Sequence, residues 1–390
     1  MKKTLICAIL MAFCAVSADA EIPIIAYGGV LPKESTVERF QEFRNAGFDV
    51  SISNFADLPT SAFIRALDNA QKCNVRLFAL SSELWEYPEA TIIAIKNHPA
   101  LYGYYIYDEP FSNQMTDMKK RYDRFRRADS SKPFYMNLIP YYDDGLLRRM
   151  RIANYRDYVR SACNTGVPQI CFDYYPITKS GIRSKWYMNL EIIRNESLRT
   201  NRPFWAFALS TPHADYPQPT LEMLRLQMYT NLAYGAKALL YFTYWTPPRT
   251  KDFIFRNGPI DVNGKRTKTY DVVRSMNMEL RPLLPLFDKG TVTSVQHLGN
   301  HVSEGTTPMK TVPLNVSRLV VYGSQGAVVS NMKADGHEYL VVVNKGYKKH
   351  LGVHIEAKSM VVHIDKTLQA RALKNDYDLG GGDMIIFRLQ

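Results

Sequence analysis

The amino-acid sequence predicts an α/β fold, a (β/α)8 TIM barrel followed by a small C-terminal all-β sandwich domain. Up to about residue 245, short β-rich runs alternate with amphipathic stretches at helical spacing. The β-rich runs are apolar almost throughout, as in parallel strands that are buried on both faces. After about residue 289 the helical stretches give way to a series of short strands. We therefore expect a signal peptide at residues 1–20, the barrel at 21–288 and the sandwich at 289–390.

The barrel is predicted from eight β-rich runs, seven of which are separated from the next by a helix-like segment. These strands are expected at residues 22–30, 49–54, 75–81, 101–107, 133–139, 169–174, 203–209 and 238–244. Eight βα units close naturally into a barrel. A doubly wound open sheet is the alternative, but no G-x-G-x-x-G follows the first strand, so nucleotide binding has no support.

A helix at residues 271–286 is expected to close the barrel, and the chain then changes character. Short strands with Gly, Asn and Asp between them are expected at 318–322, 327–330, 339–344, 352–355, 360–364 and 384–389. Runs at this spacing are typical of a β-sandwich of about 100 residues.

The N-terminus has the pattern of a secretory signal. Lys2 and Lys3 precede an apolar run at residues 5–16, and Ala18 and Ala20 form an A-x-A cleavage site. No later stretch approaches the roughly 20 apolar residues of a membrane span. The protein is therefore expected in the periplasm or outside the cell.

Composition narrows the class of partner. The formal net charge of +12 can attract anionic glycans, although the basic residues are scattered, which favours a solvated basic surface. No basic run interleaves with aromatic residues as in a nucleic-acid groove, so nucleic acid is not expected as a partner. The 25 Tyr and 18 Phe suit sugar binding, since flat rings stack on sugar faces, but large cores use them too.

Cysteine and histidine spacing predicts no cofactor. Cys73, Cys163 and Cys171 remain after signal removal and form no C-x-x-C pair, so neither a zinc site nor a disulfide framework is indicated. No two His or Cys have the spacing of metal ligands.

The sharpest chemical signal is the run Tyr107, Asp108, Glu109 and Pro110. Two adjacent acids end an apolar strand, at the barrel face where TIM-barrel active sites lie. Burial there is expected to raise at least one carboxyl pKa and keep that group protonated near neutrality. Glycoside hydrolysis needs such an acid to protonate the leaving oxygen, together with a second carboxylate.

The Asp-Glu-Pro run resembles the Asn-Glu-Pro of clan A (β/α)8 glycoside hydrolases. That resemblance implies that Glu109 is the general acid/base and that Asp108 stands where an Asn binds the substrate 2-hydroxyl. The segment 261–264 with its following helix is similar to the barrel-closing segment of family 42-type β-galactosidases and their relatives, which implies a sugar subsite lined by Trp245.

One departure from the family is plain: the seventh strand carries no Glu at its end, and Asp215 lies in a loop five residues further on. Three alternatives remain. Asp173, at the end of the sixth strand, is the partner carboxylate of Glu109; or Asp108 is a nucleophile with Asp173 as acid, as in α-galactosidase-like barrels; or the adjacent acids assist an acetamido group of the substrate, as in hexosaminidases.

Further side chains at predicted strand ends are expected to bind a carbohydrate substrate. They are Tyr27, Asn54, Asn137, Tyr175, His213, Tyr244 and Trp245. For Tyr27, Tyr175 and Trp245 the simpler interpretation is packing at the rim, and for His213 it is a hydrogen bond within a loop. Glu83 and Asp215 are expected to be surface acids. The competing class of function is a non-catalytic glycan-binding barrel that has lost the nucleophile of strand seven.

Overall fold

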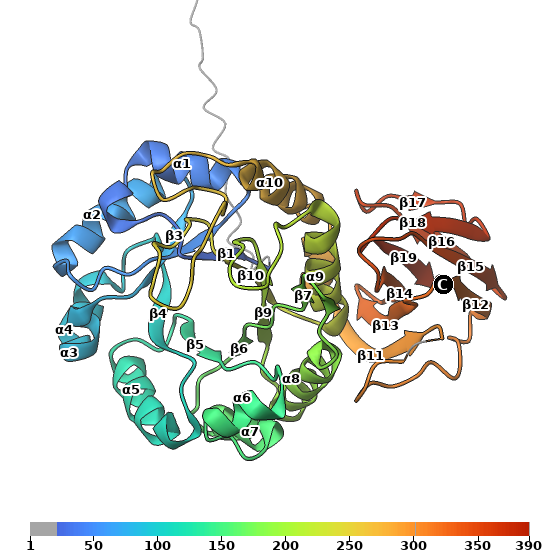
Figure 1. Cartoon of the computed structure of the whole chain (residues 1–390), viewed down its shortest axis with the longest axis horizontal. Helices are drawn as coiled ribbons and strands as arrows, with labels where there is room; N and C mark the ends of the chain where they lie inside the picture. The colour runs from blue at the N-terminus through green and yellow to red at the C-terminus, as the bar shows by residue number, and fades with distance from the viewer. Residues whose placement is uncertain (1–21, 301, 390) are drawn as a thin grey trace, which may run out of the picture.

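The computed structural model describes residues 22–300 and 302–389, and the signal peptide predicted at 1–20 lies outside them. Eight parallel strands close into a barrel with helices around it, and antiparallel sheets follow (Figure 1). The predicted fold class, a TIM barrel with a C-terminal β-sandwich, is confirmed. No helix in the described part of the chain is long and apolar enough to cross a membrane.

The barrel strands follow one another around the ring in chain order. They are β1 (Ile24–Tyr27), β2 (Val50–Ile52), β3 (Arg76–Ala79), β4 (Leu101–Asp108), β5 (Phe134–Leu138), β6 (Ile170–Phe172), β9 (Phe204–Leu209) and β10 (Ala238–Phe242), and β10 pairs with β1. Seven of these strands lie within their predicted ranges. The eighth, β4, begins where predicted and continues one residue past the predicted end, to Asp108. A small antiparallel hairpin, β7 (Ile177–Thr178) and β8 (Gly181–Ile182), follows β6 and was not predicted.

The barrel helices lie outside the ring of strands (Figure 1). They are α1 (Val37–Asn45), α2 (Thr60–Gln71), α3 (Ser82–Glu86), α4 (Pro88–Ile95), α5 (Met115–Ala128), α6 (Asp144–Arg149), α7 (Tyr155–Asn164), α8 (Trp186–Thr200) and α9 (Leu221–Tyr234). Side-chain oxygens cap several N-termini; for example, Thr36 accepts from the Arg39 amide at α1, and Thr220 accepts from the Met223 amide at α9.

The helix expected at 271–286 is two helices, α10 (Lys268–Leu280) and α11 (Leu284–Lys289). Pro282 and Pro285 lie near the junction; each lacks a backbone N–H, and Pro285 occupies the first turn of α11, where that donor is not needed. The first strand of the sandwich, β11, begins two residues after α11, at Thr291.

The sandwich consists of a six-stranded and a three-stranded sheet. The larger holds β11 (Thr291–Leu298), β13 (Ala327–Ala334), β14 (His337–Asn344), β19 (Met384–Leu389), β16 (Val361–Ile364) and β17 (Ala370–Arg371). The smaller holds β12 (Val316–Tyr322), β15 (Leu351–Ala357) and β18 (Asp376–Leu379). Residues such as Val329, Val342 and Phe387 on one sheet and Val353 on the other share one apolar core.

Helix α9 packs against both the barrel and the sandwich. It lies between the barrel and the sheet of β11, β13 and β14 (Figure 1), and most of its residues from Leu224 to Tyr234 are buried. The barrel's outer core is continuous with residues of that sheet, including Val341 and Ile386. A helix with apolar contacts on two sides needs apolar residues around most of its circumference, which is why its sequence shows little amphipathic pattern.

The barrel interior is filled by large side chains. Ile25, Phe78, Tyr135, Trp205 and Leu240 form a separate buried cluster enclosed by the strands. The three cysteines of the described chain are buried and unpaired. The interior of the barrel is therefore a packed core, and a substrate cavity is expected at the C-terminal ends of the strands.

Candidate active site

A cavity of about 290 Å³ opens at the C-terminal ends of the barrel strands. Its lining is three acids, one amide, one imidazole and nine tyrosines and phenylalanines: Asp108, Glu109, Asp173, Asn137, His213, Tyr27, Tyr135, Tyr142, Tyr175, Tyr216, Phe207, Phe242, Phe253 and Phe255. This is the barrel face on which the sequence placed the site.

Two breaks in strand alternation bring Asp108 and Glu109 to the same cavity. Successive side chains of a regular strand point to opposite faces. The pairing of β4 with β5 shifts by one residue at Ile106, which sets Asp108 opposite Asn137. Glu109 then adopts the left-handed conformation, with φ +51°, which costs free energy for a residue with a side chain. Such strain at the tip of a strand is typical of functional sites.

Asp108 is held by neighbouring hydroxyls. Tyr27 donates a 3.1 Å hydrogen bond to Oδ2, and Tyr135 donates a 3.5 Å bond to Oδ1. Burial raises the pKa of Asp108, and hydrogen bonds from Asn137, Tyr27 and Tyr135 oppose that rise. These donors favour the ionised form of this carboxyl group.

Glu109 and Asp173 form a pair of acids in hydrogen-bond contact. Burial, followed by the charge of Asp108, raises the pKa of Glu109 to about 7. Burial and the charges of Glu109 and Asp108 raise the pKa of Asp173, although Asn137 donates a 2.7 Å hydrogen bond to it. Because two adjacent buried carboxylates cannot both ionise readily, the pair retains one proton near neutrality.

No cation neutralises these acids within the structure. Among residues 22–300 and 302–389, none of Asp108, Glu109 and Asp173 has an ion pair with Lys, Arg or His. The described residues also contain no cluster of three His, Cys, Asp or Glu arranged to hold a metal ion. All three acids are partly exposed, so a ligand in the cavity can reach them.

An aromatic wall faces the acids. The His213 ring lies 4.8 Å from that of Tyr216, 5.6 Å from that of Phe242 and 5.0 Å from that of Phe255, between ring centroids. Burial lowers the pKa of His213, so its imidazole is neutral at pH 7. Phe253 continues this wall toward solvent, with 44% of its surface exposed.

The structure brings most of the predicted site residues together and leaves three apart. Tyr27, Asp108, Glu109, Asn137, Asp173, Tyr175 and His213 line the cavity, whereas Asn54, Tyr244 and Trp245 do not. Asn54 is exposed and its side chain accepts from the Ala56 amide.

Tyr244 and Trp245 lie on the other side of the barrel wall. β10 ends at Phe242, two residues before the predicted end, so strand alternation does not continue to Tyr244. The Tyr244 ring packs against Phe43, 4.9 Å between centroids, and the Trp245 ring lies 5.3 Å from the Arg39 guanidinium. The aromatic side chain that strand eight turns to the cavity is therefore Phe242.

The other acids considered in the sequence have local partners. Asp215 pairs with Arg183 at 3.5 Å and does not line the cavity. Glu83 accepts a 2.8 Å hydrogen bond from the Thr60 amide at the start of α2. β9 ends at Leu209 and is followed by Ser210, so no carboxylate stands at its tip.

Several lining residues were missed in the sequence: Tyr135, Tyr142, Phe207, Tyr216, Phe242, Phe253 and Phe255. Strand alternation could have indicated Tyr135, which precedes Asn137 by two residues on β5. The residues contributed by loops have no such periodic signal.

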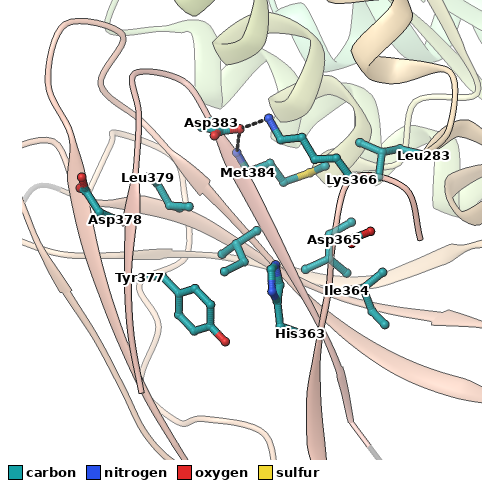
Figure 2. A pocket seen from close by; sticks show the side chains of 12 residues that line it. Leu283, His363, Ile364, Asp365, Lys366, Tyr377, Asp378, Leu379, Asp383 and Met384 are labelled. Atoms are coloured by element: carbon teal, nitrogen blue, oxygen red, sulfur yellow. Dashed lines mark hydrogen bonds and ion pairs between the residues drawn. The ribbon is translucent and has the colours of Figure 1, made fainter. Parts of the chain in front are cut away.

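A second cavity, of about 260 Å³, lies in the sandwich next to Leu283 (Figure 2). Its charged groups are paired. Lys366 lies 2.6 Å from Asp383, whose side chain also accepts from the Met384 amide, as Figure 2 shows, and Asp365 pairs with Arg371 at 2.7 Å. The acids of this cavity are neutralised by basic side chains, so it lacks the close group of carboxyl groups without cations that the barrel cavity has.

The fold is similar to that of solved (β/α)8 glycoside hydrolases, as predicted, and the likeness is one of structure. No family model matches the chain, and no curated protein matches it. It is similar to the β-galactosidase from Bacillus circulans sp. alkalophilus, with a TM-score of 0.61, 11% identity and coverage of 95% of this chain and 99% of the other.

Two other solved structures show the same likeness. A catalytic mutant of Gan42B, a GH42 β-galactosidase from G. stearothermophilus, has a TM-score of 0.64 at 7% identity, with 95% of this chain and 98% of the other covered. A GH27 β-L-arabinopyranosidase from Geobacillus stearothermophilus has a TM-score of 0.50 at 9% identity, with 95% and 96% covered. At these identities the shared property is the fold.

Proposed function

We propose that the protein is a glycoside hydrolase that cleaves an oligosaccharide or polysaccharide outside the cytoplasm. One observation carries the proposal: Asp108, Glu109 and Asp173 converge, with no neutralising cation among the described residues, on one aromatic-walled cavity at the C-terminal face of the barrel. Glycosidases need one protonated and one ionised carboxyl group at a sugar ring, and this set of acids supplies both. The glycosidases with the same fold add support.

Glu109 is the proton donor in this proposal. Its raised pKa keeps it protonated up to about pH 7, and Asp173 shares that proton through their hydrogen bond. As the bond between the anomeric carbon and the glycosidic oxygen breaks, the proton moves from Glu109 to the departing oxygen. The hydroxyl of a water molecule then bonds to the anomeric carbon, and the other proton of that water returns to the Glu109–Asp173 pair.

Asp108 is the second carboxylate, which acts at the anomeric carbon either directly or through a water molecule. Paired glycosidase carboxyls stand about 5–9.5 Å apart, across the sugar, whereas Asp173 is in contact with Glu109. That contact favours Asp173 as a partner in proton sharing. Asp108 accepts hydrogen bonds from Tyr27 and Tyr135, which favour its ionised form.

The test is product analysis on neutral and anionic polysaccharides and on aryl glycosides, with Glu109→Gln as the matched variant. We expect wild-type protein to release reducing ends and the variant to lose about 10²- to 10⁴-fold in rate on substrates with poor leaving groups. Calorimetry should show that the variant still binds the glycan. A fully active Glu109→Gln protein would contradict the assigned role.

A second candidate is a non-catalytic glycan-binding barrel. It is favoured by the tip of β9, where Leu209 and Ser210 stand without a carboxylate. Wild-type protein that binds a glycan under the same conditions but releases no reducing ends would support this candidate over the enzyme.

Export is part of the proposal and rests on the sequence alone. Lys2, Lys3 and the A-x-A at Ala18–Ala20 support a signal peptide cleaved before Glu21. Cell fractionation and N-terminal sequencing of the mature protein test it, and an uncleaved chain in the cytoplasm would contradict it.

A further inference from the structure

The backbone that carries Glu109 is strained and needs support from its surroundings. Glu109 has a left-handed φ of +51°, and such a conformation persists only where neighbouring contacts determine it. The Glu109 amide donates a 2.9 Å hydrogen bond to the Asn137 carbonyl, which fixes the residue on one side. On the other side stands Pro110, which is buried. Because proline has no N–H, its carbonyl is the one backbone group through which a hydrogen bond can hold it.

Tyr158 makes that hydrogen bond. It lies on α7 and is 2% exposed, and its hydroxyl donates a 2.8 Å bond to the Pro110 carbonyl while accepting a 3.1 Å bond from the Ile139 amide. A phenol has one proton to donate and lone pairs to accept, so both bonds form at once. Burial raises the pKa of Tyr158 above its ordinary value, so the hydroxyl remains a donor at neutral and acidic pH.

The two bonds tie together the segments that follow two neighbouring strands. Pro110 directly follows Glu109 after β4, and Ile139 lies directly after the end of β5, two residues beyond Asn137. Tyr158 itself does not line the cavity. It therefore acts on the acids only through the backbones to which they belong.

The opposite end of the same tip has a separate anchor. Where the register of β4 and β5 shifts, the Arg121 guanidinium of α5 donates a 2.9 Å hydrogen bond to the Ile106 carbonyl. Arg121 thus holds the backbone before the acids, and Tyr158 holds it after them. The angle at which Glu109 leaves the strand depends on the second anchor.

We propose that Tyr158 is a positioning residue, whose hydroxyl holds the backbone after Glu109 so that the Glu109 carboxyl group stays in contact with Asp173. The effect on rate rests on the proposed function, because it assumes that Glu109 protonates a glycosidic oxygen. The restraint on the backbone holds whatever the protein binds. Tyr158→Phe keeps the packing of the ring and removes both bonds, which lets the tip relax.

The first measurement is hydrogen exchange by mass spectrometry, with Tyr241→Phe as the matched control. Tyr241 on β10 is also buried, and its hydroxyl donates a 2.8 Å bond to Asn277 on the outer helix α10. Each variant loses one oxygen atom, so both should fold. Exchange in the peptide that contains Glu109 should be at least roughly 10-fold faster in Tyr158→Phe and unchanged in Tyr241→Phe. Since the Glu109 amide is bonded to Asn137, faster exchange there reports movement of the tip.

The second measurement is steady-state kinetics on a glycan that the wild-type protein hydrolyses. In Tyr158→Phe, kcat should fall roughly 10- to 100-fold and KM should change by less than about 3-fold, because the acid is misplaced while the sugar contacts remain. Burial is the largest cause of the raised pKa of Glu109, so a carboxyl group that relaxes toward solvent should move the alkaline limb of kcat/KM to lower pH. A merely structural role would lower thermal stability without moving that limb.

The outcomes separate this inference from the proposed function. Faster exchange at Glu109 in Tyr158→Phe alone, with no hydrolysis by the wild type, would sink the enzyme and keep the restraint. Exchange at Glu109 that matches wild type, or that both variants accelerate equally, would overturn the restraint whatever the activity. An active wild type whose kcat and alkaline limb survive Tyr158→Phe would overturn the positioning role.

Discussion

The side-chain amide of Asn137 donates a 2.7 Å hydrogen bond to Oδ1 of Asp173, which directly follows the neighbouring strand β6. The backbone carbonyl of the same Asn137 accepts a 2.9 Å bond from the Glu109 amide. One residue of β5 therefore fixes both members of the proton-sharing pair: the carboxyl of Asp173 and the strained backbone that carries Glu109.

Asn137→Ala removes the side-chain bonds to Asp173 and Asp108 and leaves the backbone bond to Glu109 in place. We expect kcat to fall about 10²-fold, because the acid pair loses its fixed position. The bond from Asn137 lowers the pKa of Asp173, so the variant should hold the shared proton to higher pH. Initial rates measured across pH test this, and a uniform loss of rate without a shift of the alkaline limb would indicate a merely structural role.

The pH dependence of wild-type activity follows from the raised pKa of Glu109. The proton donor is present below about pH 7 and is lost as pH rises through that value. We therefore expect kcat/KM to fall on the alkaline side with an apparent pKa near 7 that belongs to the Glu109–Asp173 pair. A profile that stays flat to pH 9 would contradict proton donation by this pair.

The same raised pKa predicts how stability depends on pH. In the unfolded chain Glu109 ionises near pH 4.3, whereas in the folded protein it ionises at about 7, so unfolding between these values releases a proton. The stability of the wild-type protein relative to Glu109→Gln should decline as pH rises from about 4.5 to about 7. Urea unfolding at several pH values measures this difference.

How much of this site was predictable depends on whether a residue belongs to a regular element. Asp108, Glu109 and Asp173 could be located because acids that end apolar runs stand out, and TIM barrels gather strand ends on one face. The mutual contact of Glu109 and Asp173 could not be predicted, since it depends on the shift at Ile106 and the left-handed Glu109.

The aromatic wall was the less predictable part. The family resemblance, together with a predicted eighth strand that extended two residues too far, placed Trp245 at the sugar. Because β10 stops at Phe242, Trp245 packs instead beside Arg39. Phe253 and Phe255 come from a loop whose course is fixed by hydrogen bonds, such as that between the Arg256 amide and the Pro212 carbonyl. No sequence period indicates such contacts.

Glu279 connects the barrel to the sandwich and should contribute to stability. On α10, it accepts hydrogen bonds from Arg225 and Tyr229 of α9 and from Lys366 of the sandwich. Burial opposes its ionisation, but these bonds outweigh burial and lower the pKa of Glu279. We expect Glu279→Gln to reduce the free energy of unfolding by about 1–3 kcal/mol in urea titrations at pH 7.

The contribution of Glu279 has a definite pH window and a matched control. Because its pKa is lowered on folding, its stabilisation is present above the unfolded pKa of about 4.3 and is lost as pH falls through its folded value. Glu338→Gln, which removes an exposed pair with Lys333, should change stability by less than about 0.5 kcal/mol. Equal losses for the two variants would show that Glu279 has no special part in joining the domains.

Phe253 is expected to hold the sugar that follows the cleaved bond. It lines the cavity, yet 44% of its surface is exposed, and its backbone is fixed by bonds to Thr250 of 2.9 and 3.0 Å. Phe253→Ala should raise KM for tri- and tetrasaccharides by roughly 3- to 10-fold, which corresponds to about 0.5–1.5 kcal/mol of lost stacking, and should affect small aryl glycosides less.

Ile254→Ala is the matched control, since Ile254 is equally exposed at 44% and does not line the cavity. The KM of this variant should stay that of wild type. Steady-state kinetics on both substrate lengths separates the cases: if Phe253→Ala raised KM equally for short and long substrates, the ring would serve the sugar inside the cavity and the position of the second sugar would lie elsewhere.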